Sequence, residues 1–470
     1  MAKIHFGTDG WRAVISDDFT FENVKIAAQA IADYVKGEEK RARLIVGYDT
    51  RFLSEKYAEL ISCVLAANGI KVVLTDSPTP TPSVSFNIKH RKFTGGVMVT
   101  ASHNPGRYNG IKYKMYFGGS AGKEITDVIE SRLHKSRIKF IDKKTALKRG
   151  LLKIENIIPL HLKFAKQFAD MPLLKKAKLK ILVDSMNGAG ASLMEEVLKE
   201  TNIKVTTINA ARDPYFGGRP PEPNEVHLQS TAKVVRRGRF DVALAMDGDA
   251  DRLGVILPSG KILSGHKVMT LLLLHLLEDR NMTGGVVQTI CGTGLVDKIC
   301  KVYGLATYET AVGFKYIAEI FNKNDILLGG EETGGVAFKG WLPERDAILS
   351  GLLILEMITY RKKGGLPKIL ENINKTYGIY VYKRLDLRYT KDRKKKLMAR
   401  LKKKPFKKVL GKAVVRVKSF DGFKFVRSDG SWFMLRPSGT EPKLRVYSEG
   451  RSEKEAKRLV DFGKRFALGI

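Results

Sequence analysis

The 470-residue chain has few cysteines and no long apolar run. Its three cysteines, Cys63, Cys291 and Cys300, form no Cys-x-x-Cys pair, which excludes a disulfide framework and predicts buried, reduced thiols of a cytoplasmic protein. The most apolar run, Val268–Leu277, is much shorter than the roughly 20 residues that a membrane-spanning helix needs. The first residues also lack the apolar core of a secretion signal, so we expect neither export nor a membrane span.

Acidic residues are scarce relative to basic ones: 49 Asp and Glu face 83 Lys and Arg, which gives a formal charge of +34. The excess is densest between Lys375 and Lys412, where Leu397, Met398 and Leu401 recur at a spacing typical of a short amphipathic helix with a solvated basic face. Zinc-finger and KH-type spacings are absent from the sequence, so we expect no specific nucleic-acid partner. Weak, salt-sensitive binding to RNA or anionic lipid is expected of such a surface, and a protein of that kind is the non-enzymatic alternative.

Strand-like and helix-like segments alternate along most of the chain. Apolar runs such as Arg43–Asp49, Lys71–Asp76 and Gly95–Thr100 are separated by helical periodicity, which predicts βαβ units and a largely parallel sheet. Closely spaced strands replace this alternation near the C-terminus. We therefore predict three α/β domains and a C-terminal α+β domain, with the boundaries 1–148, 149–256, 257–368 and 369–470.

Two loops carry residues suited to phosphate and metal chemistry. Ser102 lies in the segment Thr100–Pro105 after an apolar strand, where open α/β sheets place ligands, and it is a possible nucleophile. Asp247, Asp249 and Asp251 alternate between two apolar strands, and carboxylate oxygens so close together suit Mg²⁺. Taken alone, the first loop is equally compatible with an ordinary turn.

Two further loops are Gly-rich or basic. Glu331 and Thr333 in the segment Gly329–Gly335 could bond vicinal hydroxyl groups, although the segment alone is only a Gly-rich turn. The segment Arg436–Pro442, followed by Lys443 and Arg445, is compatible with a phosphate-binding loop and with a charged hairpin turn. The sequence contains no Walker A motif and no complete Gly-x-Gly-x-x-Gly motif, so nucleotide binding is not supported.

These four loops, in this order, together with the opening segment Gly7–Arg12, resemble the α-D-phosphohexomutase family of phosphoglucomutases and phosphomannomutases. The resemblance covers nearly the whole chain. It implies an α/β fold of three similar mixed-sheet α/β domains plus a C-terminal α+β domain around a central cleft.

The resemblance also implies roles for individual residues. Ser102 is the phosphorylated serine, which binds Mg²⁺ together with Asp247, Asp249 and Asp251. Lys112 is the general acid/base, which requires that neighbouring positive charge lower its pKa. The remaining implied residues are Arg12 and His103 in the catalytic group, Arg252 near the reacting phosphate, Lys315, Glu331 and Thr333 for substrate and sugar hydroxyls, and Arg436, Ser438, Gly439, Thr440 and Arg445 for the distal phosphate.

The implied activity interconverts hexose 1-phosphate and hexose 6-phosphate, with a hexose 1,6-bisphosphate as activator. Related bacterial phosphomannomutase-type and glucosamine-type enzymes often end the sugar loop in Gly-His, whereas Gly335 stands here. The segment Glu331–Gly335 is nearer to the Glu-Glu-Ser loops of phosphoglucomutases, which favours glucose phosphate with mannose phosphate as a second substrate. The alternatives are a phosphoglucosamine mutase and a metal-dependent sugar phosphatase. The expected partners are small-molecule sugar phosphates, and the expected oligomeric state is a monomer or a dimer.

Overall fold

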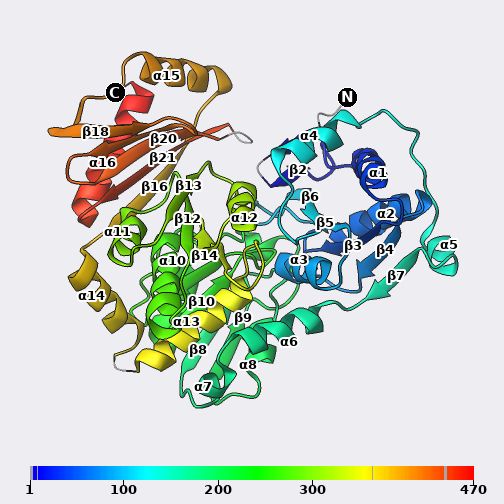
Figure 1. The fold of residues 1–470 in the computed structure, drawn as a ribbon, viewed down its shortest axis with the longest axis horizontal. Coiled ribbons are helices and arrows are strands. Elements are labelled where there is room, and N and C mark those ends of the chain that lie inside the picture. Colours follow the sequence, from blue (N-terminus) through cyan, green and yellow to red (C-terminus); the bar gives the residue numbers. More distant parts are fainter. Residues whose placement is uncertain (1–3, 8, 363, 439–441, 470) are drawn as a thin grey trace.

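Figure 1 shows the computed structural model, which describes residues 4–7, 9–362, 364–438 and 442–469. The chain forms three α/β units followed by a C-terminal unit with an antiparallel sheet, which confirms the predicted fold class. Within the described part of the chain, none of the helices combines the length and the apolar character that a membrane crossing requires.

The first unit has a mixed sheet in the order β1-β2-β6-β5-β3-β4-β7. Its strands are β1 (Phe6–Gly7), β2 (Gly10–Val14), β3 (Arg43–Tyr48), β4 (Lys71–Thr75), β5 (Gly95–Val99), β6 (Tyr108–Met115) and β7 (Leu152–Glu155). Its helices are α1 (Phe21–Glu38), α2 (Ser54–Ala67), α3 (Thr81–His90), α4 (Lys123–Ser131) and α5 (Lys143–Lys148). Strand β7 pairs with β4, so this sheet extends beyond the domain boundary predicted at residue 148.

The second unit has a smaller sheet in the order β11-β10-β8-β9. Its strands are β8 (Lys180–Asp184), β9 (Lys204–Ile208), β10 (Val242–Met246) and β11 (Leu253–Ile256). Its helical segments are α6 (Ile158–Phe168), α7 (Met171–Lys175), α8 (Leu193–Leu198), the 3₁₀ turn η1 (Phe216–Gly218) and α9 (Gln229–Gly238).

The third unit has a sheet in the order β13-β12-β14-β15. Its strands are β12 (Gly285–Thr289), β13 (Thr307–Thr310), β14 (Ile326–Gly330) and β15 (Val336–Phe338). Its helical segments are α10 (Gly265–Leu274), the π-helical turn η2 (His275–Asp279), α11 (Gly294–Val302), α12 (Phe314–Lys323), α13 (Ala347–Arg361) and α14 (Gly365–Tyr377).

One topology recurs in all three α/β units. In each, a first strand pairs in parallel with a second strand on one side and with a third strand on the other, and a fourth strand returns antiparallel to the third. The turn from the third strand to the fourth is the β5–β6, β10–β11 or β14–β15 connection. These connections carry Ser102, the three aspartates and Glu331 respectively, so the three predicted chemical loops occupy equivalent positions at the carboxyl ends of parallel strands.

The hydrophobic cores do not follow the three α/β units one by one. The first unit has its own core, whereas the second and third units share a continuous cluster that includes residues from Ile158 to Tyr380 and also Phe86 of α3. Helix α14 buries Leu366, Ile369 and Ile373 in this shared core. The third unit therefore continues to the end of α14, beyond the boundary predicted at residue 368.

The fourth unit is an antiparallel sheet in the order β16-β21-β20-β19-β18-β17. Its strands are β16 (Val381–Arg388), β17 (Lys408–Val409), β18 (Lys412–Lys418), β19 (Phe423–Arg427), β20 (Trp432–Pro437) and β21 (Lys443–Gly450), and its helices are α15 (Lys391–Lys403) and α16 (Glu453–Leu468). Helix α15 buries Leu397 and Leu401 and exposes most of its lysines, which confirms the predicted basic amphipathic helix.

A buried ion-pair cluster on α13 predicts acid sensitivity of the shared core. Glu356 accepts hydrogen bonds from Arg280 at 2.6 Å and lies 3.0 Å from the Nε2 atom of His275. Burial acts to raise the pKa of Glu356, but the hydrogen bonds from His275 and Arg280 outweigh burial and lower this pKa to about 2. Because the folded-state pKa is depressed, the carboxylate stabilises the fold above the unfolded-state pKa of about 4.3, and this stability is lost as the pH falls toward 2.

We therefore expect Glu356→Gln to lower the free energy of unfolding by about 3 kcal/mol at neutral pH. The variant should also lose less stability than the wild type between pH 5 and pH 3, a range set by these pKa values. Urea unfolding at several pH values measures both effects. If the free energy of unfolding changed with pH in the same way in the variant and the wild type, Glu356 would not be the source of the acid sensitivity.

Candidate active site

The Ser102 hydroxyl is held against the aspartate loop of the second unit. Ser102 is fully buried, has a left-handed backbone conformation with φ of 50°, and donates a hydrogen bond from Oγ to Asp247 Oδ2 at 2.9 Å. Its N–H group donates to Thr100 Oγ1 at 2.8 Å. Such a backbone conformation is strained for a residue other than Gly and is often found at functional sites. The loop thus fixes the position of the Ser102 hydroxyl beside Asp247.

A buried arginine fixes the course of this loop. Arg51, which the sequence analysis missed, pairs with Asp49 at 2.9 Å and is completely buried. Its guanidinium donates to four backbone carbonyl groups of the serine loop, those of Ser102, Asn104, Pro105 and Tyr108. The rigid array of guanidinium donors suits this task, because one side chain can hold several acceptors at fixed angles.

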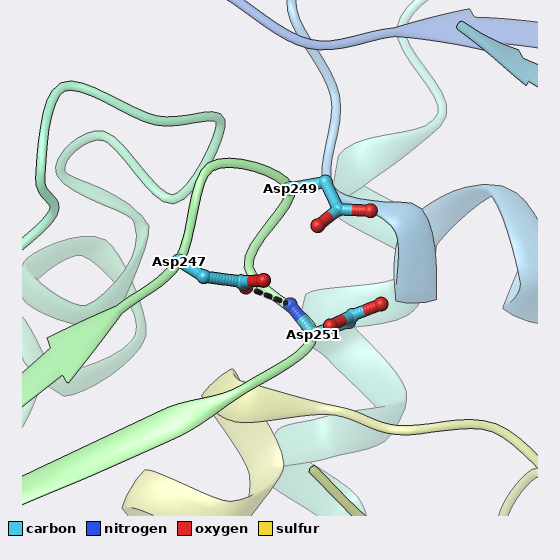
Figure 2. Close-up of side chains that lie close together, drawn as sticks. All are labelled: Asp247, Asp249 and Asp251. Carbon is cyan, nitrogen blue, oxygen red and sulfur yellow. Dashed lines mark hydrogen bonds between the residues drawn. The ribbon is translucent and has the colours of Figure 1, made fainter. Parts of the chain in front are cut away.

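The three aspartates of the β10–β11 loop form the candidate metal centre. Figure 2 shows their carboxylates converging, and one oxygen of each lies within 4.8 Å of one oxygen of the others. All three residues are fully buried. Asp247 Oδ1 accepts hydrogen bonds from the N–H groups of Asp251 at 2.9 Å and Arg252 at 3.1 Å, so the loop backbone holds this carboxylate in place.

Asp249 and Asp251 each have one oxygen fixed by the protein and one oxygen without a hydrogen-bond partner among the described residues, whereas both oxygens of Asp247 accept hydrogen bonds. Asp249 Oδ2 accepts from Thr81 Oγ1 at 2.6 Å and from Lys112 Nζ at 2.7 Å, and Asp251 Oδ2 lies 2.8 Å from a guanidinium nitrogen of Arg345. Within the described residues, the buried Oδ1 atoms of Asp249 and Asp251 have no hydrogen-bond partner. Buried carboxylate oxygens without partners are costly, and hard oxygen donors suit Mg²⁺. The site therefore fits a divalent cation.

The protonation equilibria of the triad reflect its crowding. Burial and the neighbouring carboxylates raise the pKa of Asp247 well above its ordinary value, and burial also raises the pKa of Asp251. For Asp249 burial acts in the same direction, but Lys112 outweighs it and lowers the pKa of that carboxyl. A bound cation would relieve the repulsion among the three charges.

Lys112 on β6 lies at the centre of these acidic groups. Its Nζ atom is 2.7 Å from Asp249, 2.9 Å from Asp9 and 3.4 Å from Asp251. The expectation that neighbouring positive charge lowers its pKa is wrong. Burial does act to lower the pKa of Lys112, but the surrounding carboxylates outweigh it and raise the pKa above its ordinary value.

Arg345 joins three of the predicted loops, and the sequence analysis did not identify it. The side chain is 1% exposed and pairs with Asp251 at 2.8 Å, Asp9 at 3.1 Å and Glu331 at 3.4 Å. It therefore connects the aspartate loop, the N-terminal segment and the sugar loop. The Pro-Glu-Arg-Asp stretch before α13 carries a high density of charge beside an apolar helix, which is the signal that could have indicated a buried ion pair.

The predicted sugar loop follows β14. Glu331 is buried, which raises its pKa, and the Thr333 hydroxyl is buried without a hydrogen-bond partner among the described residues. Gly335 packs against the Arg345 side chain so closely that a Cβ atom at position 335 would overlap it. A histidine at position 335 is therefore incompatible with this placement of Arg345.

Basic residues surround the serine loop. Arg12 donates to Asn104 at 2.8 Å, and Arg252 has buried Nε and Nη1 atoms without hydrogen-bond partners among the described residues. His103 Nδ1 lies 3.4 Å from Ser102 Oγ. Burial, followed by the charges of Arg252, Arg12, Arg445 and Arg384, lowers the pKa of His103 well below its ordinary value. The ring is thus neutral, and the excess positive charge suits an anionic ligand.

The predicted distal phosphate loop joins β20 and β21. Arg436 pairs with Asp421 at 2.9 Å, Ser438 is buried, and Arg445 lies near Asp386 at 3.9 Å. Gly439 and Thr440 lie outside the described residues. On α12 of the third unit, Lys315 Nζ is 3.5 Å from the carbonyl oxygen of Gly7 and so contacts the N-terminal segment.

Four family models match consecutive parts of the chain. They are described as alpha/beta/alpha domains I, II and III of phosphoglucomutase/phosphomannomutase and the C-terminal domain, and they match residues 3–139, 159–260, 264–377 and 390–463. The third match ends at residue 377, where α14 also ends.

Known proteins similar to the chain agree with these matches. A phosphoglucomutase/phosphomannomutase of Thermococcus kodakarensis is 32% identical over 98% of both chains, and a phosphoglucosamine/phosphogalactosamine mutase of Sulfurisphaera tokodaii is 30% identical over the full length of both. A crystal structure from Thermus thermophilus, assigned as a phosphomannomutase, covers 100% of both chains with 32% identity and a TM-score of 0.88.

The repeated α/β units and the four family matches define an isomerase-type phosphotransferase. The chain belongs to the phosphoglucomutase/phosphomannomutase family.

Proposed function

We propose that the protein interconverts hexose 1-phosphate and hexose 6-phosphate, with glucose and mannose phosphates as substrates, through a phosphorylated Ser102 and a bisphosphorylated sugar. The observation that carries the proposal is the 2.9 Å hydrogen bond from Ser102 Oγ to Asp247, beside two buried carboxylate oxygens without partners. A nucleophilic hydroxyl and a divalent-cation site in contact are what phosphoryl transfer requires.

In the proposed reaction, the bond between phosphorus and Ser102 Oγ breaks while a bond to the sugar hydroxyl oxygen forms. The departing serine oxygen takes a proton from Lys112, and the sugar hydroxyl passes its own proton to the amine that this leaves, so the lysine is protonated again after each transfer. Lys112 is the proposed proton carrier, and its raised pKa means that it holds a proton at neutral pH, which suits donation to the serine oxygen. Transfer of the second phosphate back to Ser102 then completes the isomerisation.

Positive charge must offset a phosphoserine of about −1.5 to −2 and a phosphorylated sugar. Mg²⁺ held by Asp247, Asp249, Asp251 and the phosphoserine would supply a fixed positive charge at the non-bridging oxygens. Arg12 and Arg252 add positive charge from the protein itself, and the Nη1 atom of Arg252 is a buried donor without a hydrogen-bond partner among the described residues. We assign Arg436, Ser438, Gly439, Thr440 and Arg445 to the phosphate that does not react, and Lys315, Glu331 and Thr333 to the substrate.

Replacing Lys112 distinguishes the rate of proton transfer during turnover from the phosphorylation of Ser102. We expect Lys112→Met to lower turnover by about 10²–10⁴-fold, the usual contribution of a general acid/base, while intact-mass measurement still finds phosphate on Ser102. Lys112→Arg keeps the positive charge but binds its proton too tightly to carry it, so it should also be slow. Wild-type turnover in Lys112→Arg would show that only the charge is needed.

A coupled assay tests the proposed function directly. Glucose 1-phosphate, mannose 1-phosphate and glucosamine 1-phosphate are supplied separately with Mg²⁺ and a trace of the corresponding 1,6-bisphosphate. We expect glucose and mannose 6-phosphates to form and chelation of the metal to stop the reaction. Release of inorganic phosphate instead of an isomer would identify a phosphatase.

Glucosamine phosphate is the alternative substrate that one observation favours. The Sulfurisphaera tokodaii relative, 30% identical over the whole chain, is named for amino sugars. Turnover of glucosamine 1-phosphate well above that of the glucose and mannose substrates would establish this alternative.

A further inference from the structure

Helix α3 of the first unit begins directly against the metal loop of the second unit. The N–H group of Thr81 donates to the carbonyl oxygen of Asp249 at 2.9 Å, and the Thr81 hydroxyl donates to Asp249 Oδ2 at 2.6 Å. Both residues are completely buried. We propose that Thr81 is a positioning residue for metal binding, which sets the orientation of the Asp249 carboxylate from another unit of the fold.

The two carboxylate oxygens of Asp249 differ in their hydrogen bonds. Oδ2 accepts from Thr81 and Lys112, which leaves the buried Oδ1 atom without a partner among the described residues. Thr81 holds the Asp249 backbone and its carboxylate together, so the carboxylate cannot rotate without losing a short hydrogen bond. Lys112 also contacts Oδ2, but its Nζ atom is shared with Asp9 and Asp251, so it is not dedicated to the orientation of Asp249. Thr81 is therefore the contact that would keep Oδ1 available to a bound cation.

Helix α3 is itself anchored to the rest of the molecule two residues further along, at Ser83. Ser83 Oγ lies 2.9 Å from His161 Nδ1, and His161 Nε2 lies 2.8 Å from Asp346, all of them buried. These contacts join α3 to α6 and to the beginning of α13. Thr81 thus projects from a helix held on two sides, and the same unit carries Ser102. The contact consequently aligns the serine with the metal ligands.

The chain offers a matched control for this contact. Thr231 is also buried and donates from its hydroxyl to a buried carboxylate, that of Asp184, at 2.6 Å. Asp184 is not one of the three clustered aspartates. Thr81→Val and Thr231→Val therefore remove the same kind of hydrogen bond at the same distance, and only the first touches a proposed metal ligand.

The inference rests on the metal site of the proposed function, so the experiment measures binding and not turnover. Mg²⁺ affinity of the full-length protein is determined by calorimetry, with Mn²⁺ binding followed by electron paramagnetic resonance. Residues that orient metal ligands typically contribute 10–100-fold in affinity, so we expect Thr81→Val to bind Mg²⁺ about 10–100-fold more weakly. Thr81→Ser keeps the hydroxyl and should stay within about threefold of the wild type, as should Thr231→Val.

Unchanged Mg²⁺ affinity in Thr81→Val, or equal weakening in Thr231→Val, would overturn the inference. Thermal unfolding of all variants detects a general loss of structure, and Thr81→Ser then decides whether the hydroxyl is responsible. If Thr81→Ser binds as weakly as Thr81→Val, the hydroxyl has no positioning role. If the wild type binds no Mg²⁺, the metal site of the proposed function fails, and Thr81 has no ligand to position.

Discussion

Ser102→Ala is expected to eliminate both the phosphorylated form of the protein and its mutase activity. The substitution removes the only atom at which the proposed phosphoenzyme can form, and it leaves Asp247 Oδ2 without its donor. Loss of an enzymatic nucleophile lowers turnover by roughly 10⁴-fold or more, because the remaining groups bind substrate without offering a route for transfer. The cost to folding should be about 1–3 kcal/mol, because one buried acceptor loses its hydrogen bond.

Intact-mass measurement and the coupled assay together test this result. Ser62→Ala is the matched control, because Ser62 is equally buried but donates only to the Ala58 carbonyl within α2. That variant should keep its phosphate and its turnover. Phosphate retained on Ser102→Ala, or turnover near that of the wild type, would place the phosphoryl acceptor elsewhere.

Arg345→Met is expected to have the second-largest effect, on stability and on turnover together. The substitution leaves the carboxylates of Asp9, Asp251 and Glu331 without their shared cation. Removing one member of a buried ion-pair network costs about 3–5 kcal/mol, since less positive charge then faces the buried carboxylates, although Lys112 still pairs with Asp9 and Asp251. We expect the free energy of unfolding to fall by this amount. Turnover should also fall, because Arg345 no longer fixes the positions of the Asp251 and Glu331 carboxylates relative to each other.

Urea unfolding and the coupled assay measure the two effects of Arg345→Met. Arg361→Met, at the other end of α13, is the control. Arg361 pairs with Glu278 and Asp279 but is 22% exposed, so its loss should cost only about 1 kcal/mol and leave turnover intact. Equal destabilisation by the two substitutions would show that Arg345 has no special place in the network.

Local patterns in the sequence were sufficient to predict the fold class and to locate the loops of the candidate active site. Apolar strands followed by Ser102, by the three aspartates and by Glu331 mark carboxyl ends of parallel strands, because alternating strands and helices leave few other arrangements. The spacing of Leu397 and Leu401 likewise predicted α15, since helical periodicity is a property of neighbouring residues.

Contacts between distant residues depended on the tertiary structure alone. Ser102 and Asp247 are 145 positions apart, and Arg345 and Asp9 are 336 positions apart, so no periodicity or spacing connects them. The pKa of Lys112 was mispredicted for the same reason: it depends on which charges surround the amine, and the fold places carboxylates there. Residues near in sequence determine strands, helices and loops. Packing between units determines which distant side chains come into contact, and the candidate active site consists of such contacts.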